Sequence, residues 1–113
     1  MSWPGLADTG ASRTIVPLLA CHELNLAPRD WRRPSGFDPQ SPRRPIPLYY
    51  VRIGIAGIGD MPLHAYAVER SNILLGRDFL SDLVLLIDGR SSTWQLGRSS
   101  VVTRSLARLL ALC

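Results

Sequence analysis

The sequence predicts one mainly β domain with short helices, arranged as a small closed or sandwich-like barrel. Its 113 residues suffice for a single domain, and its 46% hydrophobic content is that of an ordinary globular protein. The 9 prolines and 9 glycines lie mostly in the first two-thirds of the chain, where they favour short extended runs over long helices. These runs are irregularly spaced, and the chain contains no internal repeat.

The first half of the chain predicts two short strands and one short helix. Residues 4–8 form a candidate strand that enters a turn at Asp8-Thr9-Gly10, and residues 14–16 a second strand. Apolar side chains at helical spacing over residues 17–26, with proline as the first residue, indicate a short helix. Residues 28–47 are rich in proline and arginine without periodicity, so a loop is predicted there.

The second half predicts a long hairpin followed by shorter elements. Residues 48–56 alternate apolar and polar side chains, which is typical of a half-buried strand. Residues 61–68 are its expected partner across a glycine turn at 57–60. The remaining predicted elements are a buried run at 73–76, a brief helix at 77–83, strands at 84–87 and 93–96, and an amphipathic helix at 101–112.

The net charge of +4 comes from a chain in which every basic side chain is arginine. Several of these arginines crowd around Trp31, namely Arg29, Arg32, Arg33, Arg43 and Arg44. Nucleic-acid contact needs such a patch, but no recognition motif accompanies it, and Asp30 and Asp38 dilute its charge. We therefore expect a solvated loop and no nucleic-acid partner.

The cysteines and the hydrophobic runs exclude other classes of protein. Cys21 and Cys113 are too few for a disulfide framework, and neither has a partner at metal-ligand spacing, so ordinary thiols and no metal site are expected. The N-terminal residues lack a basic start followed by an apolar run, and no stretch reaches about 18 apolar residues. We expect a cytoplasmic protein without membrane contact.

The strongest chemical signal is the segment Leu6-Ala-Asp8-Thr-Gly-Ala-Ser12. Its apolar start predicts a strand entering the core, which leaves Asp8 at the strand end, partly shielded from water. The Thr9 hydroxyl can fix the turn, and Gly10 leaves room for another backbone or carboxylate. An aspartate before glycine also occurs for structural reasons, because its side chain bonds its own backbone. Both a catalytic and a structural aspartate are therefore open interpretations.

A second segment, Asn72-Ile-Leu-Leu-Gly76-Arg-Asp-Phe-Leu80, is a buried run ending in glycine before a helix that opens with Arg-Asp. Together the two segments resemble the retropepsins, the retroviral and retroviral-like aspartic proteases. That family has an early catalytic Asp-Thr/Ser-Gly-Ala and a late apolar-apolar-Gly motif, often followed by Arg-Asp/Asn. Arg13–Pro17 and Tyr49–Val68 look like further parts of the family pattern, so the resemblance covers residues 5 to about 96.

The resemblance implies a small closed barrel of the retropepsin type over residues 1–96, lacking the family's N-terminal strand and hairpin. Residues 97–113 lie outside the resemblance, and their apolar periodicity predicts an amphipathic helical tail that packs on the barrel or extends a dimer interface. In the catalytic turn, Asp8 would be the catalytic carboxylate and Thr9 would contact the second catalytic loop. Gly10 would accept the substrate backbone, and Ala11 and Ser12 would line the substrate groove.

The second motif would support this turn. Gly76 would pack against the catalytic loop, and Arg77 and Asp78 would be structural ion-pair residues. Two neighbouring aspartates share one proton, so the ionised one can activate water while the protonated one polarises the scissile carbonyl. No other aspartate lies in an Asp-Thr/Ser-Gly motif. The resemblance therefore implies a homodimer with two Asp8 carboxylates, a polypeptide substrate, and no metal or organic cofactor.

Three departures from the family pattern support a second interpretation. Only 7 residues precede Asp8, where the family places a strand and a hairpin. The expected flap, at 35–47, holds four prolines and a single glycine, so a regular hairpin is not expected there. Ser12 stands where viral members have aspartate, although cellular and bacterial relatives often have serine. A non-catalytic dimerisation or protein-interaction module, and an unrelated β domain, are therefore the alternatives to an aspartic endopeptidase.

Overall fold

Eight strands and two short helices make up the computed structural model, which describes residues 2–34, 44–91 and 93–97. The elements in chain order are β1 (Gly5–Ala7), β2 (Ile15–Pro17), α1 (Leu18–Glu23), β3 (Asp30–Arg32), β4 (Ile46–Ile55), β5 (Gly59–Val68), β6 (Ile73–Leu75), α2 (Arg77–Leu80), β7 (Val84–Asp88) and β8 (Thr93–Gly97). The domain is thus mainly β with few helical residues, as predicted.

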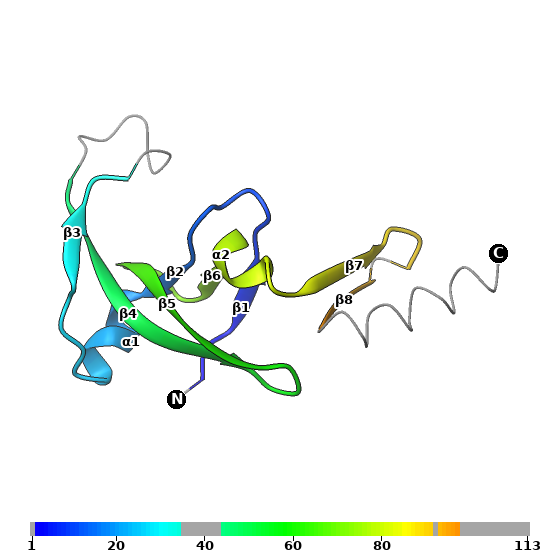
Figure 1. The fold of residues 1–113 in the computed structure, drawn as a ribbon, viewed down its shortest axis with the longest axis horizontal. Coiled ribbons are helices and arrows are strands. Elements are labelled where there is room, and N and C mark those ends of the chain that lie inside the picture. Colours follow the sequence, from blue (N-terminus) through cyan, green and yellow to red (C-terminus); the bar gives the residue numbers. More distant parts are fainter. Residues whose placement is uncertain (1, 35–43, 92, 98–113) are drawn as a thin grey trace.

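Six of the strands form one sheet in the order β1-β6-β2-β5-β4-β3 (Figure 1). Its longest part is the antiparallel β4–β5 hairpin, in register from Leu48 opposite Tyr66 to Ile55 opposite Gly59. The turn between them places Gly57 at φ 82°, a conformation that glycine adopts without strain. The hairpin predicted from the alternating pattern is therefore confirmed.

The order of the short strands determines where the loop after β1 lies. Strand β6 lies between β1, to which it is parallel, and β2, to which it is antiparallel. Residues 8–14 join β1 to β2 and must therefore pass over the end of β6. That end of β6 leads directly into Gly76 and α2, so the two sequence motifs meet at one end of the sheet.

The core lies under the sheet and is closed by the two helices. Buried side chains that pack together there are Val16, Cys21, Tyr49, Ile53, Leu63, Ala65, Ala67, Leu75, Phe79 and Leu80. In β4, Tyr49 and Ile53 are buried while Tyr50 and Arg52 are exposed, which is the alternation expected of a half-buried strand. Helix α2 contributes Phe79, which is 2% exposed, so this short helix anchors the second motif to the core.

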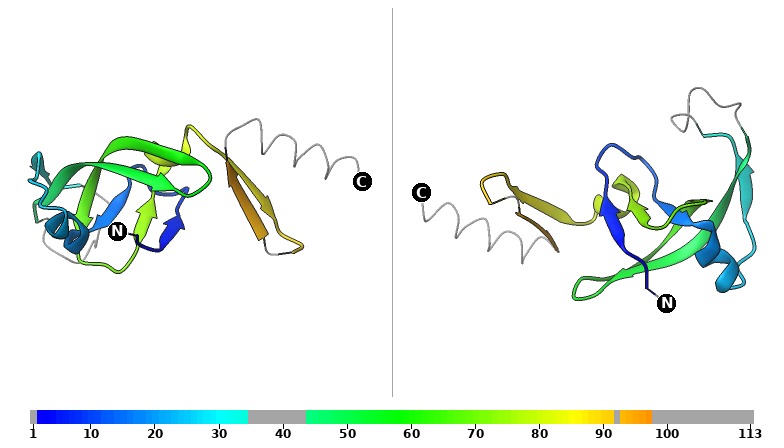
Figure 2. Two further views of the ribbon diagram at one scale, coloured as in Figure 1. Left: turned by 90° about the horizontal axis from the view of Figure 1, so that it is seen from below. Right: turned by 180° about the vertical axis from the view of Figure 1, so that it is seen from behind.

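The sheet is not closed, so the structure does not show the closed barrel that was predicted. Strands β1 and β3 are its two edges, and in the described part of the chain they pair only with β6 and β4 respectively. Strands β7 and β8 form a separate two-stranded hairpin that projects away from the sheet (Figures 1 and 2). Mainly β architecture is confirmed, whereas barrel closure is not.

The prediction of a loop over residues 28–47 was wrong at both of its ends. Strand β3 pairs with the start of β4, and Trp31 lies opposite Pro47. Proline is tolerated at this position because the pairing of β4 with β5 begins only at Leu48. Residues 35–43, which hold most of the predicted flap, and the predicted helix at 101–112 lie outside the described residues.

Across the ranges that the structure covers, neither helix has the length and apolar character needed to cross a membrane.

Candidate functional site

Asp8 lies where β1 ends and the loop over β6 begins. Its backbone N–H donates to the Leu75 carbonyl oxygen at 2.9 Å, so the strand ladder holds the residue against β6. The half-buried side chain accepts a hydrogen bond at Oδ1 from the Gly10 N–H, also at 2.9 Å. A Cβ atom on residue 10 would lie 3.2 Å from this oxygen, so glycine provides room for the contact. The carboxylate is therefore oriented by its own turn.

The tip of the turn faces solvent. The Ala11 N–H donates to the Asp8 carbonyl oxygen at 3.2 Å, which closes the turn, and Thr9, Gly10 and Ser12 are exposed. A structural aspartate would make the same side-chain contact with its backbone. Oδ2 of Asp8 has no hydrogen-bond partner within the described residues, which fits both a structural and a catalytic aspartate. The turn thus holds one carboxylate oxygen and leaves the other without a bond in the described part of the chain.

Gly76 packs directly against the far end of this loop. A Cβ atom at residue 76 would lie 2.6 Å from the Arg13 carbonyl carbon and 2.9 Å from the Thr14 nitrogen, closer than real Cβ contacts allow. The Arg77 N–H also donates to the Ala11 carbonyl oxygen at 2.8 Å. The glycine of the second motif therefore allows its backbone to touch the end of the Asp8 loop.

Thr14 and Asp78 form a partly buried clamp beneath the loop. The Asp78 carboxylate accepts bonds from the Thr14 N–H at 3.0 Å and from the Thr14 hydroxyl at 2.7 Å. It also accepts the Phe79 N–H at 2.8 Å, while the Thr14 hydroxyl accepts the Gly76 N–H at 3.1 Å. Thr14 is fully buried and Asp78 is half-buried, so these bonds are largely shielded from water, where losing one partner is costly.

The contacts of Asp78 differ from those expected for an ion-pair residue. Asp30 pairs with Arg32 and Asp60 with Arg52, whereas neither Arg77 nor Asp78 forms an ion pair with another described side chain. Asp78 fixes the loop through hydrogen bonds from Thr14, and the Arg77 side chain is exposed. The acid of the second motif is thus a loop anchor.

Thr14 is the residue of this site that the sequence did not single out. It lies at the start of a predicted strand, and 64 positions separate it from Asp78. The only signal was its position beside the motif, in the stretch Arg13-Thr-Ile-Val-Pro17. A hydroxyl group at the first position of an otherwise apolar strand is compatible with many roles, so this contact requires the fold to be known.

The assembled site therefore offers one aspartate on a loop fixed at three points, through Leu75, Arg77 and the Thr14–Asp78 clamp. A single carboxylate can take up or release a proton, but it cannot act as base and acid at the same time on one substrate. In the ranges covered by the structure, no three His, Cys, Asp or Glu side chains form a group that could hold a metal ion.

Comparison of the chain with protein-family models, with curated proteins and with solved structures finds no match. The function is therefore inferred from the residues and from the geometry of the loop.

Proposed function

We propose that the chain is one protomer of a homodimeric aspartic-type endopeptidase of the retropepsin type, with Asp8 as its half of the catalytic pair. The observation that carries the proposal is the meeting of the two motifs at the end of β6. There the Asp8 carboxylate is aimed by the Gly10 N–H, and the loop is held by Gly76 and the Thr14–Asp78 clamp. A rigid loop is what a catalytic carboxylate needs to keep a productive geometry.

In this proposal two Asp8 side chains meet across a two-fold axis and share one proton. The ionised carboxylate takes a proton from water as the water attacks the scissile carbonyl, and the protonated carboxylate donates a hydrogen bond to the carbonyl oxygen. Thr9 and Gly10, exposed at the tip of the loop, would meet the second loop and the substrate backbone.

The test is cleavage of a peptide library between about pH 4 and 7, because a shared-proton pair works on the acid side of neutrality. The wild-type chain should be a dimer that cleaves peptides and is inhibited by a statine-type mimic of the tetrahedral intermediate. Asp8→Asn should lower the rate by at least about 10²–10⁴-fold, the range of acid–base catalysis, while the dimer persists.

Asp60→Asn is the matched control for this experiment. It removes one carboxylate from an exposed ion pair with Arg52, so cleavage should continue at the wild-type rate. Cleavage that survives Asp8→Asn, or a wild-type chain that is monomeric and inactive over the whole pH range, would contradict the proposal.

A non-catalytic protein-interaction module is the second candidate, and the exposed edge of the sheet favours it. Leu6 is 53% exposed on the edge strand β1. An open edge with an apolar side chain can pair with another chain. This candidate predicts a stable fold that binds a protein partner without cleaving peptides at any pH, and it is excluded if the wild type cleaves and Asp8→Asn does not.

A further inference from the structure

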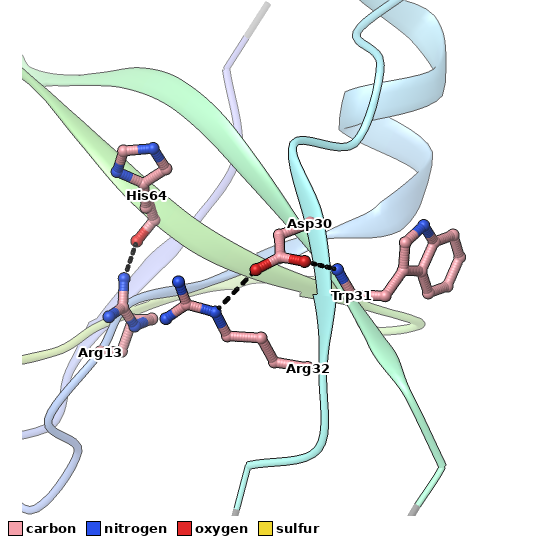
Figure 3. Close-up of polar contacts among 5 residues, drawn as sticks. All are labelled: Arg13, Asp30, Trp31, Arg32 and His64. Carbon is pink, nitrogen blue, oxygen red and sulfur yellow. Dashed lines mark hydrogen bonds and ion pairs between the residues drawn. The ribbon is translucent and has the colours of Figure 1, made fainter.

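A basic pocket of about 400 Å³ lies beside the loop that carries Asp8. It is formed by the loop before β2, by β3 with the residue before it, and by β4 and β5. Its lining residues are Arg13, Arg29, Asp30, Arg32, Leu48 and His64. Figure 3 shows the Arg13 and Arg32 side chains extending toward the same space from opposite sides, with Asp30 and His64 at its border. No part of the proposed catalytic chemistry uses these side chains.

The charge of this pocket is unbalanced. Three arginines face one carboxylate, which leaves a formal charge of +2 with His64 neutral. Asp30 is already engaged, since Oδ1 accepts the Trp31 N–H at 2.8 Å and Oδ2 accepts Arg32 Nε at 3.1 Å. The pKa of Asp30 is lowered, mainly by the hydrogen bond from the Trp31 N–H and to a smaller extent by the bond from Arg32. Its carboxylate therefore stays ionised and paired. Arg13 and Arg29 thus form no ion pair within the described residues.

The two remaining arginines are held in place by neutral contacts. Arg13 donates to the His64 carbonyl oxygen at 3.2 Å, and its guanidinium lies 5.6 Å from the centre of the Tyr66 ring. The Arg29 guanidinium lies 5.5 Å from the centre of the Tyr50 ring. Cation–π contacts of this kind position an arginine without neutralising its charge. The pocket therefore presents ordered positive charge before any ligand arrives.

Ordered guanidinium groups without a counter-ion favour an anion that can accept paired hydrogen bonds. A carboxylate matches the planar edge of a guanidinium, and such charge-assisted bonds are among the strongest in proteins. A phosphate backbone fits less well, because Asp30 repels a chain of charges more than it repels one carboxylate. A hollow of about 400 Å³ has room for one side chain and its peptide segment rather than for an extended strand of nucleic acid.

We propose that this pocket binds the carboxylate of an aspartate or glutamate side chain in a polypeptide segment. Arg13 belongs to the loop that carries Asp8, and the end of this loop packs against Gly76, so a peptide held by Arg13 would contact the same loop as the Asp8 turn. If the chain is an endopeptidase, the pocket selects substrates with an acidic residue near the scissile bond. That extension rests on the proposed function, whereas peptide binding itself does not.

The test uses the full-length Asp8→Asn variant, so that cleavage cannot consume the labelled peptide. Fluorescence anisotropy compares a labelled octapeptide containing two glutamates with the same peptide containing glutamines. The glutamate peptide should bind at least about tenfold more tightly, as one charge-assisted hydrogen bond would provide. Arg29→Gln should remove most of this preference for glutamate. Arg13→Gln should have the same effect, but it is the second variant because Arg13 lies on the Asp8 loop and its loss can also alter that loop.

Arg52→Gln is the matched control. It removes the same charge from an exposed ion pair outside the pocket, with side chains 62% and 55% exposed for Arg52 and Asp60. Binding of the glutamate peptide should change less than about twofold in this variant. An equal loss in Arg52→Gln and Arg29→Gln would show attraction to the net charge only and would overturn the proposal.

Two other anions, inorganic phosphate and a single-stranded oligonucleotide, test whether the pocket binds something other than an acidic peptide. If inorganic phosphate binds through Arg29 but the glutamate peptide shows no preference, the pocket is a small-anion site and the proposal fails. If a single-stranded oligonucleotide binds more tightly than the peptide and depends on Arg13 and Arg29, the ligand is nucleic acid and the proposal also fails. Peptide cleavage without any preference for glutamate would overturn the pocket while leaving the endopeptidase intact. If the wild-type chain cleaves no peptide but binds the glutamate peptide through these arginines, the endopeptidase proposal fails and the pocket proposal stands.

Discussion

Removing the hydroxyl of Thr14 while keeping its shape should destabilise the protein more than removing its methyl group. Thr14→Val keeps the volume of this fully buried side chain but loses the 2.7 Å bond to Asp78 and the 3.1 Å bond from the Gly76 N–H. Thr14→Ser keeps both bonds and loses only a methyl group. The two variants therefore separate hydrogen bonding from packing at one position.

The expected magnitudes follow from these contacts. A hydrogen bond to a charged group contributes about 1.5–3 kcal/mol, and a buried N–H left without a partner costs about 1–3 kcal/mol. Partial relaxation around Asp78, which keeps its bonds from the Thr14 and Phe79 N–H groups, lowers the sum to about 3 kcal/mol. Loss of one buried methyl group costs about 1 kcal/mol.

The assay is urea unfolding followed by tryptophan fluorescence and circular dichroism, at one fixed protomer concentration because a dimer's stability depends on it. With an m value of about 2 kcal/mol/M, Thr14→Val should lower the midpoint by about 1.5 M and Thr14→Ser by about 0.5 M. A Thr14→Val variant at least as stable as Thr14→Ser would refute the clamp as the element that holds the loop.

Four further predictions test the packing, the buried thiol and the charges. Gly76→Ala should cost about 1–3 kcal/mol or more, because its Cβ would meet backbone at 2.6 Å, whereas Gly5→Ala, with nothing closer than 3.9 Å, should stay within about 0.5 kcal/mol in thermal unfolding. Burial raises the pKa of the Cys21 thiol, so its contribution to stability is present below about pH 8.5 and is lost as the pH rises. A urea unfolding midpoint that increases as the pH is raised beyond about 9 would contradict this. In Cys113→Ser, native Cys21 should react with iodoacetamide only as fast as the protein opens, because it is 1% exposed. Arg32→Gln should leave the urea unfolding midpoint nearly unchanged, since its ion pair with Asp30 is about half exposed and screened by solvent.

The long elements could be predicted from the sequence because their burial is periodic. Alternation along residues 48–56 reflects a strand with one face in the core, and it correctly indicated the β4–β5 hairpin. Strand β3 gave no such signal, since all three of its residues are exposed and it is held in the sheet by pairing with β4 alone. Pro47 also argued against a strand. It is tolerated in β4 because the pairing with β5 begins one residue later, at Leu48.

In the candidate site, too, the residues of compact motifs could be predicted from the sequence, whereas the contacts between distant segments could not. Asp8 and Gly76 were identified because each belongs to a compact motif, and the strand order brings those motifs together at the end of β6. The Thr14–Asp78 clamp and the basic pocket depend on contacts between distant segments, such as Arg13 with His64 across 51 positions. The arginine-rich stretch gave a signal of its own, but only the fold shows that Arg29 and Arg32 join Arg13 around one pocket.

The two proposals make opposite demands on the number of chains. The pocket is built entirely within one protomer, from the loop before β2, β3, β4 and β5, so binding of an acidic peptide should be independent of protomer concentration. The catalytic pair needs a second Asp8, because one carboxylate cannot be base and acid at once. Cleavage per protomer should therefore fall on dilution below the dimer dissociation constant, while peptide binding by Asp8→Asn remains constant. If binding falls in parallel with cleavage, the pocket is completed by the second protomer and its assignment to one chain is wrong. If cleavage per protomer is unchanged on dilution from micromolar to nanomolar concentrations while the chain sediments as a monomer, the pairing of two Asp8 side chains is wrong.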